Sequence, residues 1–179
     1  MLRVVVSSVA VVVAVAVAVV LVGAGCDKAA DTAASAALSA ATGVDAKVTT
    51  AGGAPQMTAN SQQDGAAVAL NVGAATTAPA GFPLPVVAGL TLQQSLSTSE
   101  GGEARFMVSG TTTKSAKEIA DFYEPLLKAR GLEVSRNDLN IGGTASVHLS
   151  GVAEGRQATV SITSIGQLNM VAITTEGVQ

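Results

Sequence analysis

Four ionisable side chains in the C-terminal half are the strongest candidates for chemistry. Glu118, Asp121 and Glu124 are spaced at i, i+3 and i+6, so a helix would bring their carboxylates towards one side. His148, the only histidine, lies in the alternating stretch Ser146–Ser150, which favours a strand. Together these groups could bind a cation or move a proton. We favour the other interpretation, a solvated acidic face near a helix N-terminus and an exposed strand histidine.

Other chemical motifs are missing from the sequence. No Gly-x-Ser-x-Gly turn exposes a nucleophilic serine, and no Gly-x-Gly-x-x-Gly or Walker motif opens a helix. One cysteine excludes a disulfide framework and a cysteine-based zinc site. A net charge of −3 gives no basic surface for nucleic acid. We therefore expect a protein that is not an enzyme, uses no cofactor or metal and binds no nucleic acid.

The only cysteine, Cys26, follows a long apolar segment at the start of the chain. Arg3 is the one charged residue before it, and only two serines interrupt Val4–Val22. A basic start, an apolar core and small residues are typical of a secretory signal peptide, which we place at 1–25. Ala24-Gly25-Cys26 resembles the lipobox of bacterial lipoproteins. The resemblance implies that Cys26 receives a thioether-linked diacylglycerol and becomes the mature N-terminus.

The alternative is an uncleaved transmembrane anchor. As a helix, Val4–Val22 would span about 28 Å at about 1.5 Å per residue, close to the thickness of a bilayer core. In both cases residues 27–179 lie outside the cytoplasmic membrane, at its surface, facing the periplasm or the cell exterior. Removing 1–25 takes away only Arg3, so the net charge falls from −3 to −4 and does not favour anionic lipid. Acyl chains on Cys26 would hold the protein instead.

The first part of the mature chain is predicted to form a small unit. The Ala-rich segment 28–42 favours a helix that ends at Gly43. Alternating stretches at 44–50, 56–62 and 66–72 favour three short antiparallel strands. We assign the segments as the lipid-anchored cysteine with its Ala-rich helix (26–43), a small β unit (44–72) and a linker (73–81).

Residues 82–179 are predicted to form a separate C-terminal domain of the α+β class. Its pattern reads β-β-α-β-β-β-β, with one helix packed on an antiparallel sheet. A capping box at Ser115-Ala-Lys-Glu118 opens the helix and Gly131 ends it. Phe122 and Tyr123 are about 100° apart on this helix, so both cannot face the core. We expect Phe122 to be buried and Tyr123 to lie at the boundary with its hydroxyl in water; ligand stacking by Tyr123 is the less favoured alternative.

Three landmarks of the mature chain are similar to those of uncharacterised bacterial lipoproteins. They are Ala41-Thr42-Gly43-Val44-Asp45, Gly81-Phe82-Pro83-Leu84-Pro85, and Asp121–Glu124 together with Leu127–Leu132. Such proteins are small, surface-tethered α/β domains. The resemblance therefore implies a compartment and an architecture and assigns no catalytic residue.

The functional expectation is a membrane-anchored lipoprotein of the bacterial envelope with a non-catalytic binding or accessory role. Its partners would be the membrane, through Cys26, and an envelope protein or ligand that the sequence does not identify. The alternative is a small extracytoplasmic enzyme or metal-binding protein that uses Glu118, Asp121 and Glu124 with His148.

Overall fold

The computed structural model describes residues 31–32, 35–36, 39–40, 44–51, 54–63, 66–73, 76–141 and 144–178. The predicted signal peptide and Cys26 lie outside these residues. Those described within the predicted Ala-rich segment are helical. Within the described ranges, no helix has the length and apolar character needed to span a bilayer.

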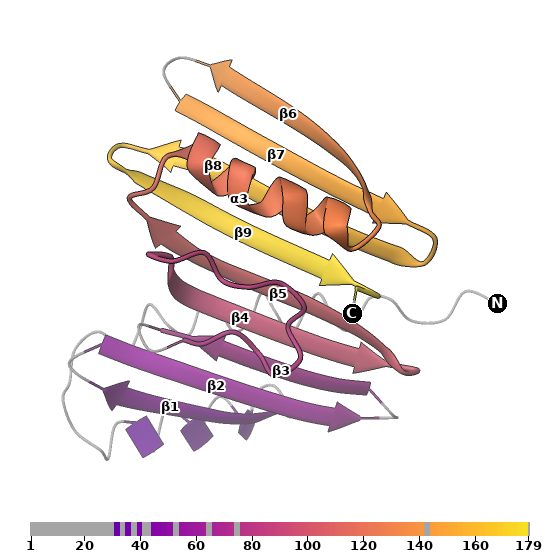
Figure 1. Cartoon of the computed structure of the whole chain (residues 1–179). Helices are drawn as coiled ribbons and strands as arrows, with labels where there is room; N and C mark the ends of the chain where they lie inside the picture. The colour runs from indigo at the N-terminus through magenta and orange to yellow at the C-terminus, as the bar shows by residue number, and fades with distance from the viewer. Residues whose placement is uncertain are drawn as a thin grey trace.

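A single antiparallel sheet of nine strands dominates the fold, with helix α3 (Ala116–Ala129) lying across one face (Figure 1). The spatial order of the strands is β1-β2-β3-β4-β5-β9-β8-β7-β6. The strands are β1 (Asp45–Ala51), β2 (Ala54–Gln63), β3 (Ala66–Val72), β4 (Thr91–Glu100), β5 (Glu103–Thr112), β6 (Glu133–Ile141), β7 (Thr144–Ala153), β8 (Arg156–Ile165) and β9 (Leu168–Glu176).

The predicted α+β class was wrong, because the described structure is sheet-dominated and its sheet is continuous across both predicted units. The individual strands lie close to the positions that alternation predicted. However, β3 pairs with β4 over Ala66–Val72 and Gln94–Glu100, which joins the first three strands to the other six. Whether 44–72 and 82–179 are separate folding units stays a prediction.

The connection between β3 and β4 packs on the sheet instead of leaving it. Residues 76–90 run over the same side as α3 (Figure 1). Leu84 and Val87 are buried in the core there, and Phe82 meets Phe106 of β5 edge to face, with ring centroids 6.1 Å apart. The guanidinium of Arg130 donates a hydrogen bond to the Pro83 carbonyl. The segment thus acts as a second cover beside α3.

The sheet face beneath α3, called the helix face below, carries the larger core. Alternate residues of the central strands point to it, including Val108, Leu149, Val160 and Val171, each with no exposed surface. The capping box at Ser115 and Glu118 is confirmed: each side chain accepts a backbone N–H of the other residue. At the other end the amides of Gly131 and Leu132 donate to the carbonyls of Lys128 and Leu127, so α3 stops there as predicted.

The two adjacent aromatic residues of α3 are placed in the reverse of the predicted order. Tyr123 is fully buried, whereas Phe122 is only partly buried. The Tyr123 hydroxyl accepts a hydrogen bond of 3.1 Å from the Val87 amide, which gives its polar tip a partner within the protein. The prediction failed because this partner lies 36 residues away in the chain, where the spacing of residues within the helix cannot reveal it.

A second, smaller core lies on the opposite face of the sheet, called the far face below, over β1 to β4. Its buried members are Ala46, Val48, Met57, Ala59 and Leu70, with Leu96 packed against them. The register places Leu96 on the far face, since its neighbour Ser95 stands opposite Val108 of the helix face. The apolar side of the sheet therefore changes between β4 and β5.

The two outer strands are treated differently. The outer edge of β1 forms hydrogen bonds with hydroxyl groups of helical residues. The Val48 amide donates to Ser35 Oγ at 2.8 Å, and the Ala46 amide donates to Ser39 Oγ at 3.0 Å. On β6, the strand carries charged side chains, and Arg136 binds Asp138 two residues further along through both carboxylate oxygens.

Candidate functional site

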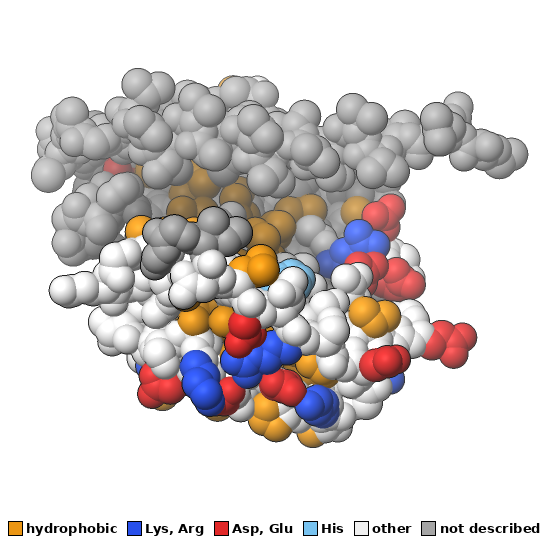
Figure 2. Space-filling model, turned by 90° about the horizontal axis from the view of Figure 1, so that it is seen from above, with side chains coloured by type: hydrophobic (Ala, Val, Ile, Leu, Met, Phe, Trp, Pro, Cys, Tyr) orange, Lys and Arg blue, Asp and Glu red, His pale blue; other side chains and the backbone are white. Residues whose placement is uncertain are grey.

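Two of the three predicted acidic residues on α3 form ion pairs, and the third, Glu118, belongs to the capping box. Asp121 pairs with Lys117 at 2.5 Å, and Glu124 pairs with Lys128 at 2.6 Å, both with i, i+4 helical spacing. Figure 2 shows acidic and basic side chains interleaved on the side of the molecule that carries α3. Asp121 and Glu124 are therefore already paired with lysines of the same helix.

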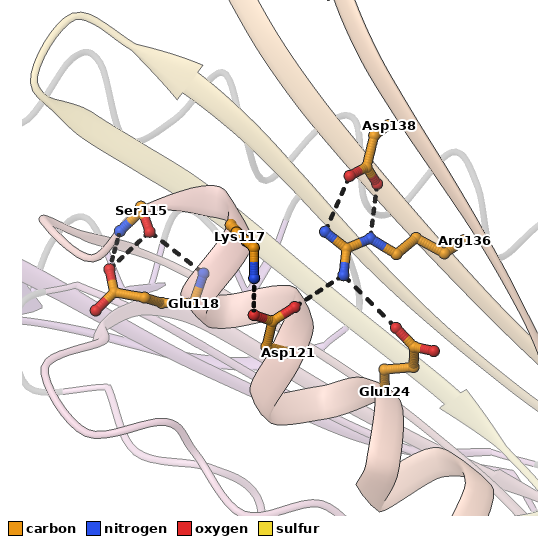
Figure 3. Close-up of polar contacts among 7 residues, drawn as sticks. All are labelled: Ser115, Lys117, Glu118, Asp121, Glu124, Arg136 and Asp138. Atoms are coloured by element: carbon orange, nitrogen blue, oxygen red, sulfur yellow. Dashed lines mark hydrogen bonds and ion pairs between the residues drawn. The ribbon is translucent and has the colours of Figure 1, made fainter.

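Arg136 of β6 joins these acids to the edge of the sheet (Figure 3). Its Nη1 lies 2.9 Å from Asp121 Oδ1 and 3.6 Å from Glu124 Oε2. Its Nε and Nη2 hold both oxygens of Asp138 at 2.8 and 2.9 Å. One guanidinium thus faces three carboxylates, a geometry that suits its planar fork of donors. Sequence reasoning missed Arg136, because the pairing depends on how β6 packs beside α3.

The electrostatics of this cluster keep the acids ionised. The hydrogen bonds from Lys117 and then Arg136 lower the pKa of Asp121, and the hydrogen bond from Lys128 lowers the pKa of Glu124. The bonds from Arg136 lower the pKa of Asp138, and the carboxylates of Asp138 and then Asp121 raise the pKa of Arg136. A general acid needs a carboxyl that keeps its proton near neutral pH. This cluster has the opposite bias.

Acidification is expected to destabilise the protein through this cluster. The folded pKa values of Asp121, Glu124 and Asp138 lie below their unfolded values of about 4, so this stabilisation is present above pH ~4 and is lost as the pH falls through the folded values. The check is the urea midpoint between pH 7 and pH 3. In Arg136→Gln the fall should be shallower. Arg105→Gln, which removes the Glu176 ion pair instead, is the control and should keep the wild-type slope; equal slopes in all three proteins would contradict the assignment.

His148 does not join the acidic run. It lies on β7 between the buried residues Val147 and Leu149, so its side chain points to the far face while α3 packs on the helix face. Its Nδ1 is 3.0 Å from Ser161 Oγ of β8. No group of three or more His, Cys, Asp or Glu among the described residues could hold a metal ion. The structure therefore does not assemble the alternative site.

An open hollow of about 300 Å³ lies where neither cover reaches the sheet, over β2 to β5 next to Ala80. The side chains that alternation directs to the helix face there come from four adjacent strands. They are Asn60, Gln62, Ala67, Ala69, Ser97, Ser99, Ala104 and Phe106.

The chemistry of the hollow is neutral and mixed. Amide groups of Asn60 and Gln62 and hydroxyls of Ser97 and Ser99 surround alanine side chains and the Phe106 ring. None of the described residues that line it is charged. A few neutral hydrogen-bonding groups around a small apolar floor can orient a ligand without attracting an ion. The sequence signal was the run of polar residues at alternate positions in 56–62, which we interpreted only as a strand.

Cys26, the predicted lipidation site, lies outside the described residues, so its surroundings are not part of this geometry. No protein-family model matches the chain, and no curated protein is significantly similar to it.

Proposed function

We propose that this chain is a lipid-anchored, non-catalytic binding protein of the bacterial cell envelope. Cys26 would carry the lipid, and the folded part would face the periplasm or the cell exterior. The anchor is supported by the position of the only cysteine, directly after Ala24-Gly25 and an apolar segment with a basic start. Anchoring by acyl chains agrees with the absence of a net positive charge.

The observation that carries the binding role is the contrast between the charged cluster and the hollow. The acids that could do chemistry are held by Lys117, Lys128 and Arg136. The hollow, in contrast, presents neutral amides and hydroxyls, which form no such ion pairs. It lies on β2 to β5, with further strands of the sheet on both sides. We infer that it binds an uncharged part of an envelope molecule that offers hydrogen-bonding groups and a small apolar surface.

A photo-crosslinking amino acid at Gln62, in the full chain and in intact cells, is expected to give one discrete adduct. Gln62 is exposed at the rim of the hollow, so a bound molecule would lie within reach of it. The matched control places the same amino acid at Thr159, which points to the far face from β8, and should give no such adduct.

A second variant connects the adduct with the hollow itself. Ala69→Leu adds a larger side chain to the floor, so the Gln62 adduct should fall several-fold while the urea midpoint stays close to that of the parent. An adduct of unchanged intensity in Ala69→Leu, or equal adducts from positions 62 and 159, would contradict binding in the hollow.

A further inference from the structure

One corner of the far face exposes large aliphatic side chains. Ile165 is 59% exposed, Leu168 45% and Met170 45%, and Leu139 of the outer strand is 49% exposed. The first three belong to the β8–β9 hairpin, whose turn contains Gly166 in the left-handed conformation. We call Ile165, Leu168, Met170 and Leu139 the hairpin patch.

The strand register places the members of the patch on one face and at one end of the sheet. Ile165 is paired directly with Leu168, and Met170 is two residues further along the same face of β9. Leu139 lies in the same row as Met170 but three strands away, with Ser146 of β7 and Thr163 of β8 between them. The patch therefore consists of three neighbouring side chains at the hairpin and a fourth, Leu139, at the edge of the same face.

The segments of β7, β8 and β9 around the patch contain no carboxylate. Residues 157–175, which include most of β8 and β9, contain no Asp, Glu, Lys or Arg, and 139–153 contain His148 as their only ionisable side chain. The charged residues of these strands lie at the other end, where Arg105 and Glu176 pair at 2.6 Å. Lys114 follows β5 near the hairpin, and its carbonyl accepts a hydrogen bond from Asn169. Asp138 precedes Leu139 on β6, and Arg136 holds its carboxylate. Residues 139–153 and 157–175 thus bring no carboxylate that would repel anionic headgroups, in a chain whose net charge is negative.

The size and composition of the patch favour lipid over a protein partner. Each aliphatic side chain offers roughly 100 Å² when fully exposed, so four that are about half exposed offer roughly 200 Å². A stable protein interface needs about 800 Å² per partner and is enriched in aromatic residues and arginine. A bilayer surface has no such requirement, because aliphatic side chains enter it one by one.

We infer that the hairpin patch rests on the lipid surface of the membrane that holds the protein, so that the tethered domain takes one preferred orientation. This inference rests on the proposed lipid anchor. It adds a second contact to the acyl chains and predicts that the opposite end of the far face, at the β7–β8 turn, stays in water.

The test uses the full chain, processed by cells that attach the lipid and reconstituted into vesicles of phosphatidylethanolamine and phosphatidylglycerol. Cysteines introduced as Ile165→Cys, Leu168→Cys and Val152→Cys are labelled with a nitrobenzoxadiazole dye. Val152 is the matched control, because it is an aliphatic residue on the same face, 50% exposed, at the opposite end of β7. Nitroxide-labelled lipids should quench the dyes at 165 and 168 at least twofold and leave the dye at 152 unchanged.

The outcomes separate the patch from the anchor. If the protein is bound to the vesicles but the nitroxide lipids quench all three dyes alike, the patch inference is overturned. If dyes at position 165 quench one another between molecules and the nitroxide lipids do not quench them, the patch contacts a second copy of the chain, which also overturns the inference. If wild-type Cys26 still reacts with the dye, the proposed anchor has failed. The patch is then tested with the same labels in Cys26→Ser protein and excess vesicles. Lipid quenching confined to the dyes at 165 and 168 supports the patch inference, and the absence of such quenching overturns it.

Discussion

Gly110→Ala is expected to destabilise the protein by about 3 kcal/mol or more, a large part of the roughly 5–15 kcal/mol that stabilises most domains. Gly110 lies on β5 opposite a bulge of β4 between Leu92 and Gln94. A Cβ at this position would overlap the Thr91 carbonyl oxygen and lie 2.8 Å from its carbon and 2.9 Å from the Leu92 Cα. These are backbone atoms of a paired strand, so relief requires β4 to move away from β5. Urea unfolding of the purified protein is the measurement.

Gly151→Ala is the matched comparison, because it is also a buried glycine in the middle of a strand. Its Cβ would meet side-chain atoms of Leu132 at 3.1 and 3.2 Å, and a leucine can shift by a few tenths of an ångström. We expect a loss of about 1 kcal/mol there. If Gly110→Ala unfolds at the same urea concentration as Gly151→Ala, the close approach of Thr91 to β5 is wrong.

Cys26→Ser is expected to abolish the incorporation of labelled fatty acid and to leave a precursor that keeps residues 1–25. A serine hydroxyl cannot form the thioether, and the chain has no other cysteine to replace it. The measurement is labelling of growing cells, followed by the apparent mass and the N-terminus of the protein. The wild-type protein should incorporate the labelled fatty acid and have a blocked N-terminus. Its polypeptide mass, without the lipid, should be lower than the 17.6 kDa of the whole chain.

The transmembrane alternative gives the opposite result. An uncleaved anchor would leave wild type unlabelled and at full length, and Cys26→Ser would behave like wild type. Labelled fatty acid in the Cys26→Ser protein would likewise rule out the lipidation site. Conversion of Ser35, which lies in the mature chain, to alanine provides a control that should change neither labelling nor length.

Local features of the fold could be predicted from the sequence, and its overall grouping could not. The capping box at Ser115 and the stop at Gly131 depend on hydrogen bonds within a few residues, so their signals are contained in short segments. The joining of β3 to β4 depends on the course of residues 76–90 between them. Pairing of strands separated by such a segment leaves no local mark, and a run rich in Gly, Ala, Thr and Pro reads as a linker.

The candidate site also combines local features that the sequence predicts with long-range contacts that it does not. The spacing of Glu118, Asp121 and Glu124 correctly indicated one charged helix surface, but the cation that ties it to the sheet, Arg136, comes from a different element. The side of the sheet on which His148 lies follows from strand alternation, and only the packing of α3 shows that this is the wrong side for a shared site. The hollow could not be predicted, because it exists where two covers stop.

The treatment of the two outer strands has a consequence for molecules crowded on a surface. An exposed strand edge can act as a template on which a second chain adds its own strand, and this is the first step of fibrous aggregation. Here hydroxyls of Ser35 and Ser39 occupy amides of β1, and the charged pair of Arg136 and Asp138 stands on β6. Under the proposed anchoring, neighbouring copies are confined to the same membrane surface and collide often. A sheet with one edge capped and the other charged can meet its neighbours without growing into them.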